Sequence, residues 1–485
     1  MDAIGIDLGT SGVKAVLIGE DGTVRAEATA PLAISHPHPL WSEQSPEDWW
    51  TATATAIAAL RARADLSTAR AIGLTGQMHG AVLLDEADNI LRPAILWNDG
   101  RSAAECAALD PLARRIAGNL AMPGFTAPKL LWVRRFEPEI FAATARVLLP
   151  KDWLRLRITG EAISDMSDAS GTLWLDVAMR RWSPALLAAC GLSPRHMPRL
   201  AEGTEPAGTV RPALAEAWGI PPGAVVAAGG GDNAVAAIGL GCIAPGAAFL
   251  SLGTSGVVFV CDESFRPAPE RAVHAFCHCL PAAWHRMAVI LAAASSLAWL
   301  AAITGAREAA LLEELDRSGI ATEHGPIFLP YLAGERTPHN DPTAAGVFFG
   351  LESATTRADL TRAVLEGVAF ALADGLDVLE EKSVRIAALS VTGGGAQSAL
   401  WGRILAAALA RPLIYHAGGE IGPALGAARL GLIAAGAGTI AEICPAPPIA
   451  RIQEPESDLA ETLAPRRALF RRLYPDLRAA FSARL

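Results

Sequence analysis

Two short apolar runs, at residues 3–6 and 247–250, are each followed by a glycine turn and then by a segment rich in β-branched residues. The turns read DLGTSG at residues 7–12 and SLGTSG at residues 251–256. Apolar and β-branched runs on either side of a glycine turn are typical of strand–turn–strand hairpins. Because the same unit occurs in each half of the chain, we predict two related domains that face each other across a cleft.

Strand and helix signals alternate after each hairpin. In the first half, Ser45 and Pro46 are typical of a helix start, and this helix is predicted to run to about residue 64. The further elements are a strand at 71–75 and, in the second half, a helix at 357–382 capped by Thr356, strands at 387–392 and 412–415, and a last helix from near Pro423. A hairpin followed by strand–helix units in each half predicts an α/β protein of two actin-like ATPase (ribonuclease H-like) domains across a catalytic cleft.

A chain of 485 residues exceeds what one hydrophobic core usually supports. We therefore expect an N-terminal domain at residues 1–245, a C-terminal domain at 246–445 and a C-terminal extension at 446–485. Hydrophobic residues make up 51% and charged residues 19% of the chain. These proportions indicate large buried cores and argue against extended disorder.

The formal net charge is −9, from 41 Lys and Arg against 50 Asp and Glu, and there is no long basic run. This argues against nucleic acid as a partner. The longest apolar stretches, such as residues 290–303, are too short to span a bilayer, and the first strand begins so early that no signal peptide is expected. Seven scattered cysteines are typical of reduced thiols. We therefore expect a cytoplasmic protein without a membrane partner, and we leave a homodimer open.

Both glycine turns suit the binding of phosphate. Glycine lets backbone N–H groups approach an anion closely, and the Thr and Ser hydroxyls of each turn add donors. The two copies differ at their first position, which is Asp7 in one turn and Ser251 in the other. Only the first turn carries a carboxylate suited to Mg²⁺. This asymmetry predicts a nucleotide held between two half-sites.

Two further glycine clusters follow predicted strands. GGGDN at residues 229–233 follows the apolar run 224–227, and a plain alternative is that its Asp232 is a helix N-cap worth about 1 kcal/mol. A cap needs no preceding glycines, so we favour close approach of a ligand. GGGA at 393–396 suits contact with a nucleoside, whereas the small residues at 422–428 indicate tight helix packing.

Two clusters of metal-ligand residue types receive other interpretations. His274 and CHC at residues 277–279 are metal-ligand types, but in a strand both cysteines share one face and His278 lies on the other, so one zinc ion cannot easily collect all three. The spacing of Asp165, Asp168 and Asp176 fits no Ca²⁺ loop. We predict a solvated acidic connection there.

The chain resembles the FGGY family of carbohydrate kinases in motifs that occur in order from about residue 4 to about residue 436. They are DLGTSG at 7–12, WSEQ at 41–44, QMHG at 77–80, LWNDGR at 96–101, GGGDN at 229–233, SLGTSG at 251–256, GERTPHN at 334–340, GVFFGL at 346–351 and GGGA at 393–396. QMHG, together with residues 93–101, is most similar to the members that act on D-xylulose, in contrast to those that act on glycerol or gluconate.

The resemblance implies ATP-dependent phosphorylation of the C5 hydroxyl of D-xylulose, which would feed xylose catabolism into the pentose phosphate pathway. Another pentulose or a polyol, such as ribulose or D-arabinitol, is the alternative substrate. A sugar-sensing actin-like regulator is a further alternative, but such proteins carry an added basic helix-turn-helix, and this chain starts directly at its first strand.

The resemblance also assigns residues by position. Asp232 matches the catalytic base. Asp7 matches the carboxylate associated with Mg²⁺, acting through coordinated water because Mg²⁺ keeps its hydration shell. The implied cofactors are ATP and Mg²⁺, and the residues expected to bind ATP are Gly9, Thr10, Ser11, Gly253, Thr254, Ser255, Gly394, Gly395 and Ala396. The residues expected to bind the sugar are Met78, His79, Asp232, Asn233, Trp97 and Asp99.

Overall fold

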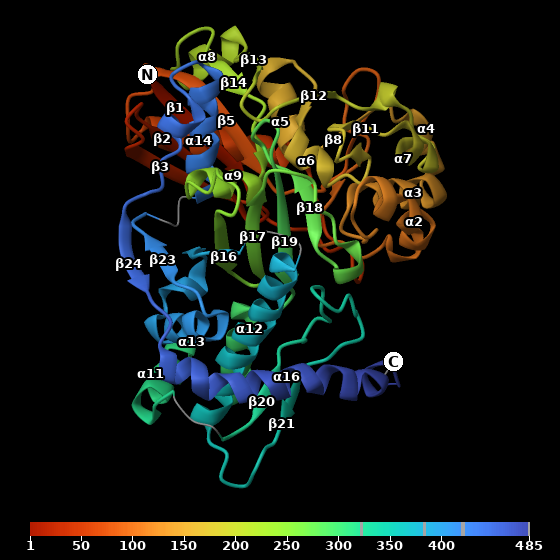
Figure 1. Ribbon diagram of the computed structural model, residues 1–485. Helices are drawn as coiled ribbons and strands as arrows, with labels where there is room; N and C mark the ends of the chain where they lie inside the picture. The colour runs from red at the N-terminus through yellow and green to blue at the C-terminus, as the bar shows by residue number, and fades with distance from the viewer. Residues whose placement is uncertain (321–323, 382–384, 419–421, 484–485) are drawn as a thin grey trace.

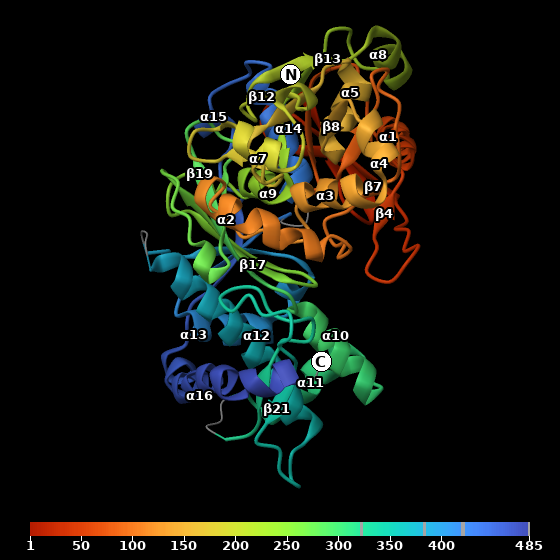
Figure 2. The same ribbon diagram turned by 90° about the vertical axis from the view of Figure 1, so that its right-hand side faces the viewer.

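The computed structural model describes residues 1–320, 324–381, 385–418 and 422–483. Its elements form two lobes, each built around a seven-stranded sheet (Figure 1). A view turned by 90° separates the same two lobes (Figure 2). The first contains α1 (Pro46–Arg61), α3 (Thr126–Phe136) and α5 (Pro150–Thr159), and the second contains α12 (Arg357–Glu380), α13 (Ala399–Leu409) and α16 (Ser457–Ala483). The part of the chain that the structure describes contains no helix long and apolar enough to cross a membrane.

The sheet of the first lobe grows from the predicted hairpin. β1 (Asp2–Leu8) pairs antiparallel with β2 (Gly12–Ile18) and parallel with β5 (Ala69–Gly76), so the hairpin and the strand after it are confirmed. The strand order is β13-β14-β5-β1-β2-β3, and β15 also pairs with β5. The remaining strands are β3 (Val24–Pro31), β13 (Pro206–Thr209), β14 (Val225–Ala227) and β15 (Gly230–Gly231). The helices of this lobe are α1 (Pro46–Arg61), α2 (Cys106–Ile116), α3 (Thr126–Phe136), α4 (Pro138–Ala143), α5 (Pro150–Thr159), α6 (Met166–Ser170), α7 (Pro184–Ala189), α8 (Pro212–Trp218) and α9 (Asp232–Gly239).

The second lobe repeats this plan. β16 (Ala248–Leu252) pairs antiparallel with β17 (Gly256–Asp262) and parallel with β22 (Leu389–Thr392), which confirms the second hairpin. The strand order is β18-β19-β17-β16-β22-β23-β24. The remaining strands are β18 (His274–Cys277), β19 (Trp284–Ile290), β23 (Leu413–His416) and β24 (Ile449–Gln453). The helices are α10 (Ala294–Thr304), α11 (Glu308–Ser318), α12 (Arg357–Glu380), α13 (Ala399–Leu409) and α16 (Ser457–Ala483).

Short two-stranded sheets complete both lobes. They are β4 (Glu43–Gln44) with β7 (Ala94–Ile95), β6 (Val82–Leu84) with β8 (Arg146–Leu148), β9 (Ile163–Asp165) with β12 (Arg199–Ala201), β10 (Leu175–Asp176) with β11 (Arg181–Trp182), and β20 (Ile327–Leu329) with β21 (Val347–Phe349). The two predicted helix starts differ in detail. Ser45 occupies the N-cap of α1 without a side-chain capping bond, whereas Thr356 and Asp359 form a capping box at α12.

Helix α14 (Gly422–Ala434) lies in sequence between β23 and β24 of the second sheet but packs in the first lobe, against β1, β5 and α9 (Figures 1 and 2). The contact is backbone to backbone. A Cβ on Gly5 would lie 1.9 Å from the carbonyl oxygen of Ala424, and a Cβ on Gly73 would lie 1.6 Å from that of Ala427. The tight helix packing predicted for residues 422–428 is therefore confirmed.

The chain thus crosses between the lobes several times. After α14 and α15 (Ile440–Ile443) it returns to the second lobe, where β24 pairs antiparallel with β23 and α16 packs against α12 and α13. The segment predicted as a C-terminal extension supplies an edge strand and a covering helix to the second lobe. The domain boundaries at residues 245 and 445 stay a prediction. They divide the chain by sequence, whereas α14, which falls within 246–445, packs on the sheet of the first lobe.

Candidate active site

Asp232 is the first residue of α9 and directly follows β15, whose partner β5 leads into the QMHG loop. Gly231 occupies the N-cap position of α9, so the alternative that Asp232 is the cap is wrong. Oδ1 of Asp232 accepts hydrogen bonds from the backbone N–H (2.7 Å) and from Nδ2 (2.9 Å) of Asn233. Burial raises the pKa of Asp232 to about 6, although the hydrogen bonds from Asn233 act in the opposite direction. A carboxyl with this pKa is suited to accept a proton near neutral pH.

Asp7, near the end of β1, shares the region of Asp232. Burial, and then repulsion by the Asp232 carboxylate, raise the pKa of Asp7 to about 7, although the charge of Lys14 acts in the opposite direction. Within the described part of the chain, the Asp7 side chain has no hydrogen-bond or ion-pair partner. Two carboxylates that repel each other at one edge of a sheet form a place where a cation would be stabilised.

The first glycine turn is tied to the QMHG loop by side-chain hydrogen bonds. Thr10 Oγ1 donates to Gln77 Oε1 (3.1 Å), and Gln77 Nε2 donates to Gln44 Oε1 (2.9 Å). Gln44 Nε2 in turn donates to the carbonyl oxygen of Thr10 (2.7 Å). Gly9 is half-buried and Ser11 is exposed, so the outer rim of the turn is accessible.

Met78 and His79 form the tip of the QMHG loop. The Met78 sulfur packs directly against Gly231, where an added Cβ would lie 2.8 Å from it. His79 has a left-handed backbone, with φ of 69°, and its Nδ1 lies 2.7 Å from the carbonyl oxygen of Gly171. Burial, and then the charge of Lys129, lower the pKa of His79 to about 3. The ring is therefore neutral, Nδ1–H donates to Gly171, and Nε2 keeps a lone pair that can accept a hydrogen bond.

Trp97 and Asp99 lie on the neighbouring loop but in different environments. Trp97 is 45% exposed, and its Nε1 donates to Thr10 Oγ1 (3.0 Å). Asp99 is buried, and its carboxylate accepts hydrogen bonds from the backbone N–H of Ser42 (2.7 Å) and from Arg101 Nη2 (2.6 Å). This arrangement leaves Trp97 accessible and places Asp99 inside the loop as one of the groups that hold its shape.

A pocket of about 670 Å³ opens beside the second glycine turn. Of the residues predicted to bind ATP, this pocket brings together Gly253, Thr254, Gly394 and Gly395, while Ser255 and Ala396 are not among its lining residues. Leu252, of the same SLGTSG motif, also lines the pocket. The other lining residues, which no sequence motif pointed to, are Ala294, Ser295, Leu297, Ala298, Glu308, Ala309, Leu312, Gln397, Ser398 and Trp401. An apolar cavity with a glycine-rich edge and a few polar groups is typical of a nucleoside site.

Three polar residues next to the site were missed from the sequence: Gln44, Gln77 and Lys129. The two glutamines belong to the WSEQ and QMHG motifs. Their polar side chains next to buried strands are a sequence signal by which they could have been selected as site residues. Lys129 is buried in α3, and its Nζ donates to the carbonyl oxygens of His79 (2.8 Å) and Gly124 (2.8 Å). No sequence signal marks this lysine, because both acceptors are backbone carbonyls and one of them, that of His79, is distant in sequence.

The prediction of a solvated acidic connection is wrong for two of its three residues. Asp165 and Asp168 are completely buried, and their carboxylates lie 2.7 Å and 3.2 Å from Nζ of Lys151. Asp176 is half-buried in β10 and accepts a hydrogen bond from the N–H of Met179. The described residues, which include the CHC segment at 277–279, contain no group of three or more His, Cys, Asp or Glu side chains placed to hold a metal ion.

Two lobes that each carry a glycine turn, with a pocket on one lobe and a carboxyl of raised pKa on the other, are the arrangement expected of a sugar phosphotransferase. Residues 3–239 match the N-terminal domain of the FGGY family of carbohydrate kinases, and residues 248–435 match its C-terminal domain. The chain belongs to the FGGY family of carbohydrate kinases, which use ATP, as its motifs predicted.

Comparison with individual proteins gives the same assignment. The chain is 53% identical over 478 residues to the xylulose kinase of Escherichia coli (strain K12). The aligned region covers 98% of this chain and 99% of that protein. It is 37% identical to the xylulose kinase of Bacillus subtilis (strain 168), over 89% and 88% of the two chains. The crystal structure of a xyloylose kinase from Brucella ovis superposes with a TM-score of 0.96 at 51% identity, over 99% of this chain and 100% of that one. These similarities confirm the predicted fold class, two actin-like ATPase domains across a cleft.

Proposed function

We propose that this protein transfers the γ-phosphoryl group of ATP to the C5 hydroxyl of D-xylulose and releases D-xylulose 5-phosphate. The observation that carries the proposal is the position of Asp232, a half-buried carboxyl at the end of the first sheet with a raised pKa, directly after Gly231, against which the Met78 side chain of the QMHG loop packs. The choice of D-xylulose is supported by the similarity to xylulose kinases over nearly the whole chain.

In this proposal Asp232 is the general base. Phosphoryl transfer has a loose transition state, so the base needs only to orient the hydroxyl and take its proton late. The pKa of about 6 leaves Asp232 ionised at neutral pH, while the hydrogen bonds from Asn233 fix Oδ1 and leave Oδ2 for the substrate. Nε2 of His79 and the backbone of Met78 would bind other sugar hydroxyls, and the exposed indole of Trp97 would border the bound sugar.

The two glycine turns would hold the phosphates from opposite sides of the cleft. The residues proposed to contact ATP are Gly9, Thr10 and Ser11 in the first turn, Gly253, Thr254 and Ser255 in the second, and Gly394, Gly395 and Ala396 along the nucleoside. Because donor and acceptor substrates then bind to different lobes, transfer requires the lobes to approach each other and to exclude water.

Asp7 is the residue we propose for Mg²⁺. Its carboxylate has no partner in the described part of the chain, and its pKa is raised to about 7, so a nearby cation would favour the ionised form. Contact through water suits an ion that loses its hydration shell reluctantly. When bound, Mg²⁺ supplies neutralisation of the phosphate charge.

We further propose that residues 1–245 supply the sugar and Mg-phosphate side and residues 246–445 the nucleotide side. The reaction would take place in the cytoplasm and feed xylose catabolism into the pentose phosphate pathway, without a nucleic-acid or membrane partner. The net charge of −9 supports the absence of nucleic acid.

A coupled ADP assay over D-xylulose, D-ribulose, D-arabinitol and glycerol tests the substrate. We expect the highest kcat/KM for D-xylulose, and a clear preference for another sugar would overturn that choice while leaving the kinase assignment intact. Asp232→Asn should lower kcat by about a hundredfold or more with D-xylulose. Asp21→Asn, in the exposed β2–β3 turn, is the matched control and should keep full activity.

A further inference from the structure

A buried ionic cluster lies next to the glycine turn that precedes Asp232. It consists of Lys151, Asp152 and Arg155 from α5, with Asp165 and Asp168 at the start of α6. All five side chains are 0% exposed. Nζ of Lys151 lies 2.6 Å from Asp152 and 2.7 Å from Asp165, and Nη1 of Arg155 lies 3.0 Å from Asp152.

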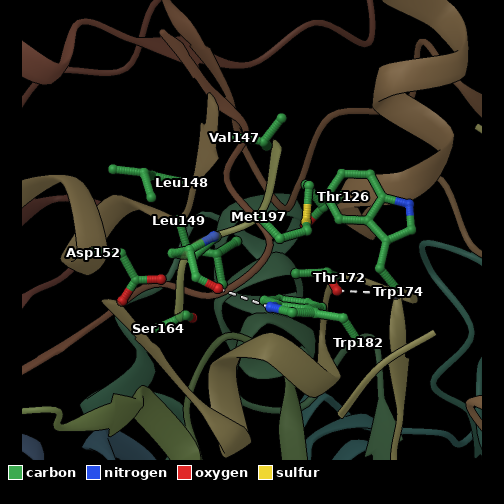
Figure 3. A pocket seen from close by; sticks show the side chains of 11 residues that line it. Thr126, Val147, Leu148, Leu149, Asp152, Ser164, Thr172, Trp174, Trp182 and Met197 are labelled. Atoms are coloured by element: carbon green, nitrogen blue, oxygen red, sulfur yellow. Dashed lines mark hydrogen bonds between the residues drawn. The ribbon is translucent and has the colours of Figure 1, made fainter. Parts of the chain in front are cut away.

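The cluster is closed to ligands. Asp152 and Ser164 border a cavity of about 10 Å³ whose other walls include Trp174 and Trp182 (Figure 3). A cavity of this size is at the limit for one water molecule. Burial raises the pKa of Asp168 well above its ordinary value, although the charge of Lys151 acts in the opposite direction. A buried cluster of charged side chains costs stability, because each charge loses its hydration. We therefore look for its role in the backbone geometry that it holds.

The cluster contacts both ends of the glycine turn. Nη2 of Arg155 donates to the carbonyl oxygen of Ala228, the residue before the first glycine. Ser167 joins the cluster to the other end: its Oγ donates to Oδ2 of Asp165 (2.5 Å) and accepts the N–H of Gly231 (3.0 Å). Gly231 is bonded directly to Asp232, so each contact restrains the backbone that carries the carboxyl.

We infer that Ser167 and Arg155 are positioning residues for the reaction, which hold the glycine turn so that Asp232 meets the substrate hydroxyl at the right distance. The inference rests on the proposed role of Asp232 as base. Neither residue contacts substrate; both act through the backbone on either side of the three glycines. The acidic segment at 165–168 thus serves the active site, although it binds no ligand.

Ser167→Ala tests this directly, because it removes the acceptor of the Gly231 N–H and, with it, the hydroxyl bond to Asp165 that joins the glycine turn to the cluster. We expect kcat for D-xylulose to fall by about tenfold or more, since small displacements of a reacting group are costly. The KM values for sugar and ATP should change by less than about threefold, because an interaction that serves the transition state alone leaves substrate binding intact. Arg155→Lys keeps the charge but cannot reach the same acceptors. It should likewise lower kcat and leave both KM values nearly unchanged.

Ser170→Ala is the matched control. Ser170 lies on the same short helix, is equally buried, and its Oγ also accepts a backbone N–H, that of Cys277 in β18 (3.0 Å). Thermal unfolding should show similar losses for the two alanine variants, while kcat of Ser170→Ala stays within about twofold of wild type. An equal fall of kcat in both variants would identify general loosening of α6 and overturn the inference, as would wild-type kcat in folded Ser167→Ala. Should Ser167→Ala not fold, Arg155→Lys decides by the same criterion.

A double variant separates this inference from the proposed function. If Ser167 acts only through Asp232, then Ser167→Ala should have no further effect on the residual rate of Asp232→Asn. A further tenfold loss in that background would show that Ser167 acts by another route. Near-normal activity of Asp232→Asn itself would instead remove the base, and with it the proposed mechanism.

Discussion

Asp7→Asn gives a stability prediction that depends on pH in a defined direction. Burial, with repulsion from Asp232, raises the pKa of Asp7 from 3.8 to about 7 in the folded protein. The folded state therefore binds this proton more tightly than the unfolded chain does. Ionisation of Asp7 costs stability progressively as pH rises from about 4 to 7, and the full cost is present above pH 7. Asparagine cannot ionise and avoids this cost.

The size of the effect follows from the same values. One pKa unit corresponds to about 1.4 kcal/mol, so the upper limit is about 4 kcal/mol. Because Asp7 is partly exposed, solvent screening reduces this, and we expect about 1–2 kcal/mol at pH 8. For domains of this size that corresponds to a rise in Tm of roughly 2–8 °C.

Thermal unfolding with EDTA, at several pH values between 5 and 8.5, measures the difference between Asp7→Asn and wild type. The difference should grow with pH and level off above about pH 7. Asp21→Asn is the control, because hydrogen bonds from Thr23 lower the pKa of Asp21, so its replacement should bring no gain at high pH. Added Mg²⁺ should raise the Tm of wild type at pH 8 and leave that of Asp7→Asn unchanged. A difference that is constant from pH 5 to 8.5 would refute the argument.

Three further predictions follow from other parts of the site and fold. The kcat/KM for D-xylulose should fall about tenfold per pH unit below pH 6 and be level above pH 7, because Asp232 accepts a proton only when ionised; a pH–rate profile without this acid limb would contradict the base assignment. Lys129→Met should raise KM for the sugar about tenfold while leaving KM for ATP unchanged, because both hydrogen bonds of Nζ to the loop at His79 and Gly124 are lost; steady-state kinetics with each substrate varied decides. Gly73→Ala should cost about 3 kcal/mol or more, since the new Cβ would lie 1.6 Å from a carbonyl oxygen of α14, whereas Gly100→Ala, with its nearest contact at 3.4 Å, should be close to neutral by denaturant unfolding.

Much of the fold could be predicted from sequence because its signals are local. The two hairpins, the capping box at Thr356 and the strands before GGGDN and GGGA each depend on residues within a few positions of one another. Asp232 could be selected for the same reason, since three glycines precede it in the chain.

The unpredicted features depend on contacts between distant segments. Asp165 and Asp168 looked like solvated acids because their cation, Lys151, comes from another helix and their burial depends on the packing of several segments. Lys129 was missed in the same way, because its acceptors are backbone carbonyls, which leave no trace in side-chain pattern. Of the residues that line the pocket proposed for the nucleotide, the prediction contained only Gly253, Thr254, Gly394 and Gly395. Helices α10 and α11 contribute others, such as Ser295 and Glu308, without any glycine signal.

The position of α14 has a consequence for how this protein is made. The first sheet is complete in sequence by residue 231, yet the helix that lies against Gly5 and Gly73 is synthesised only when the ribosome reaches residue 434. At 5–20 residues per second, the interval between α9 and α14 is roughly 10–40 s. During that time the nascent N-terminal half exposes the strand surface that α14 will cover, which is the kind of surface that chaperones bind and that aggregates. Translation of the second lobe thus sets the earliest moment at which the first can finish folding.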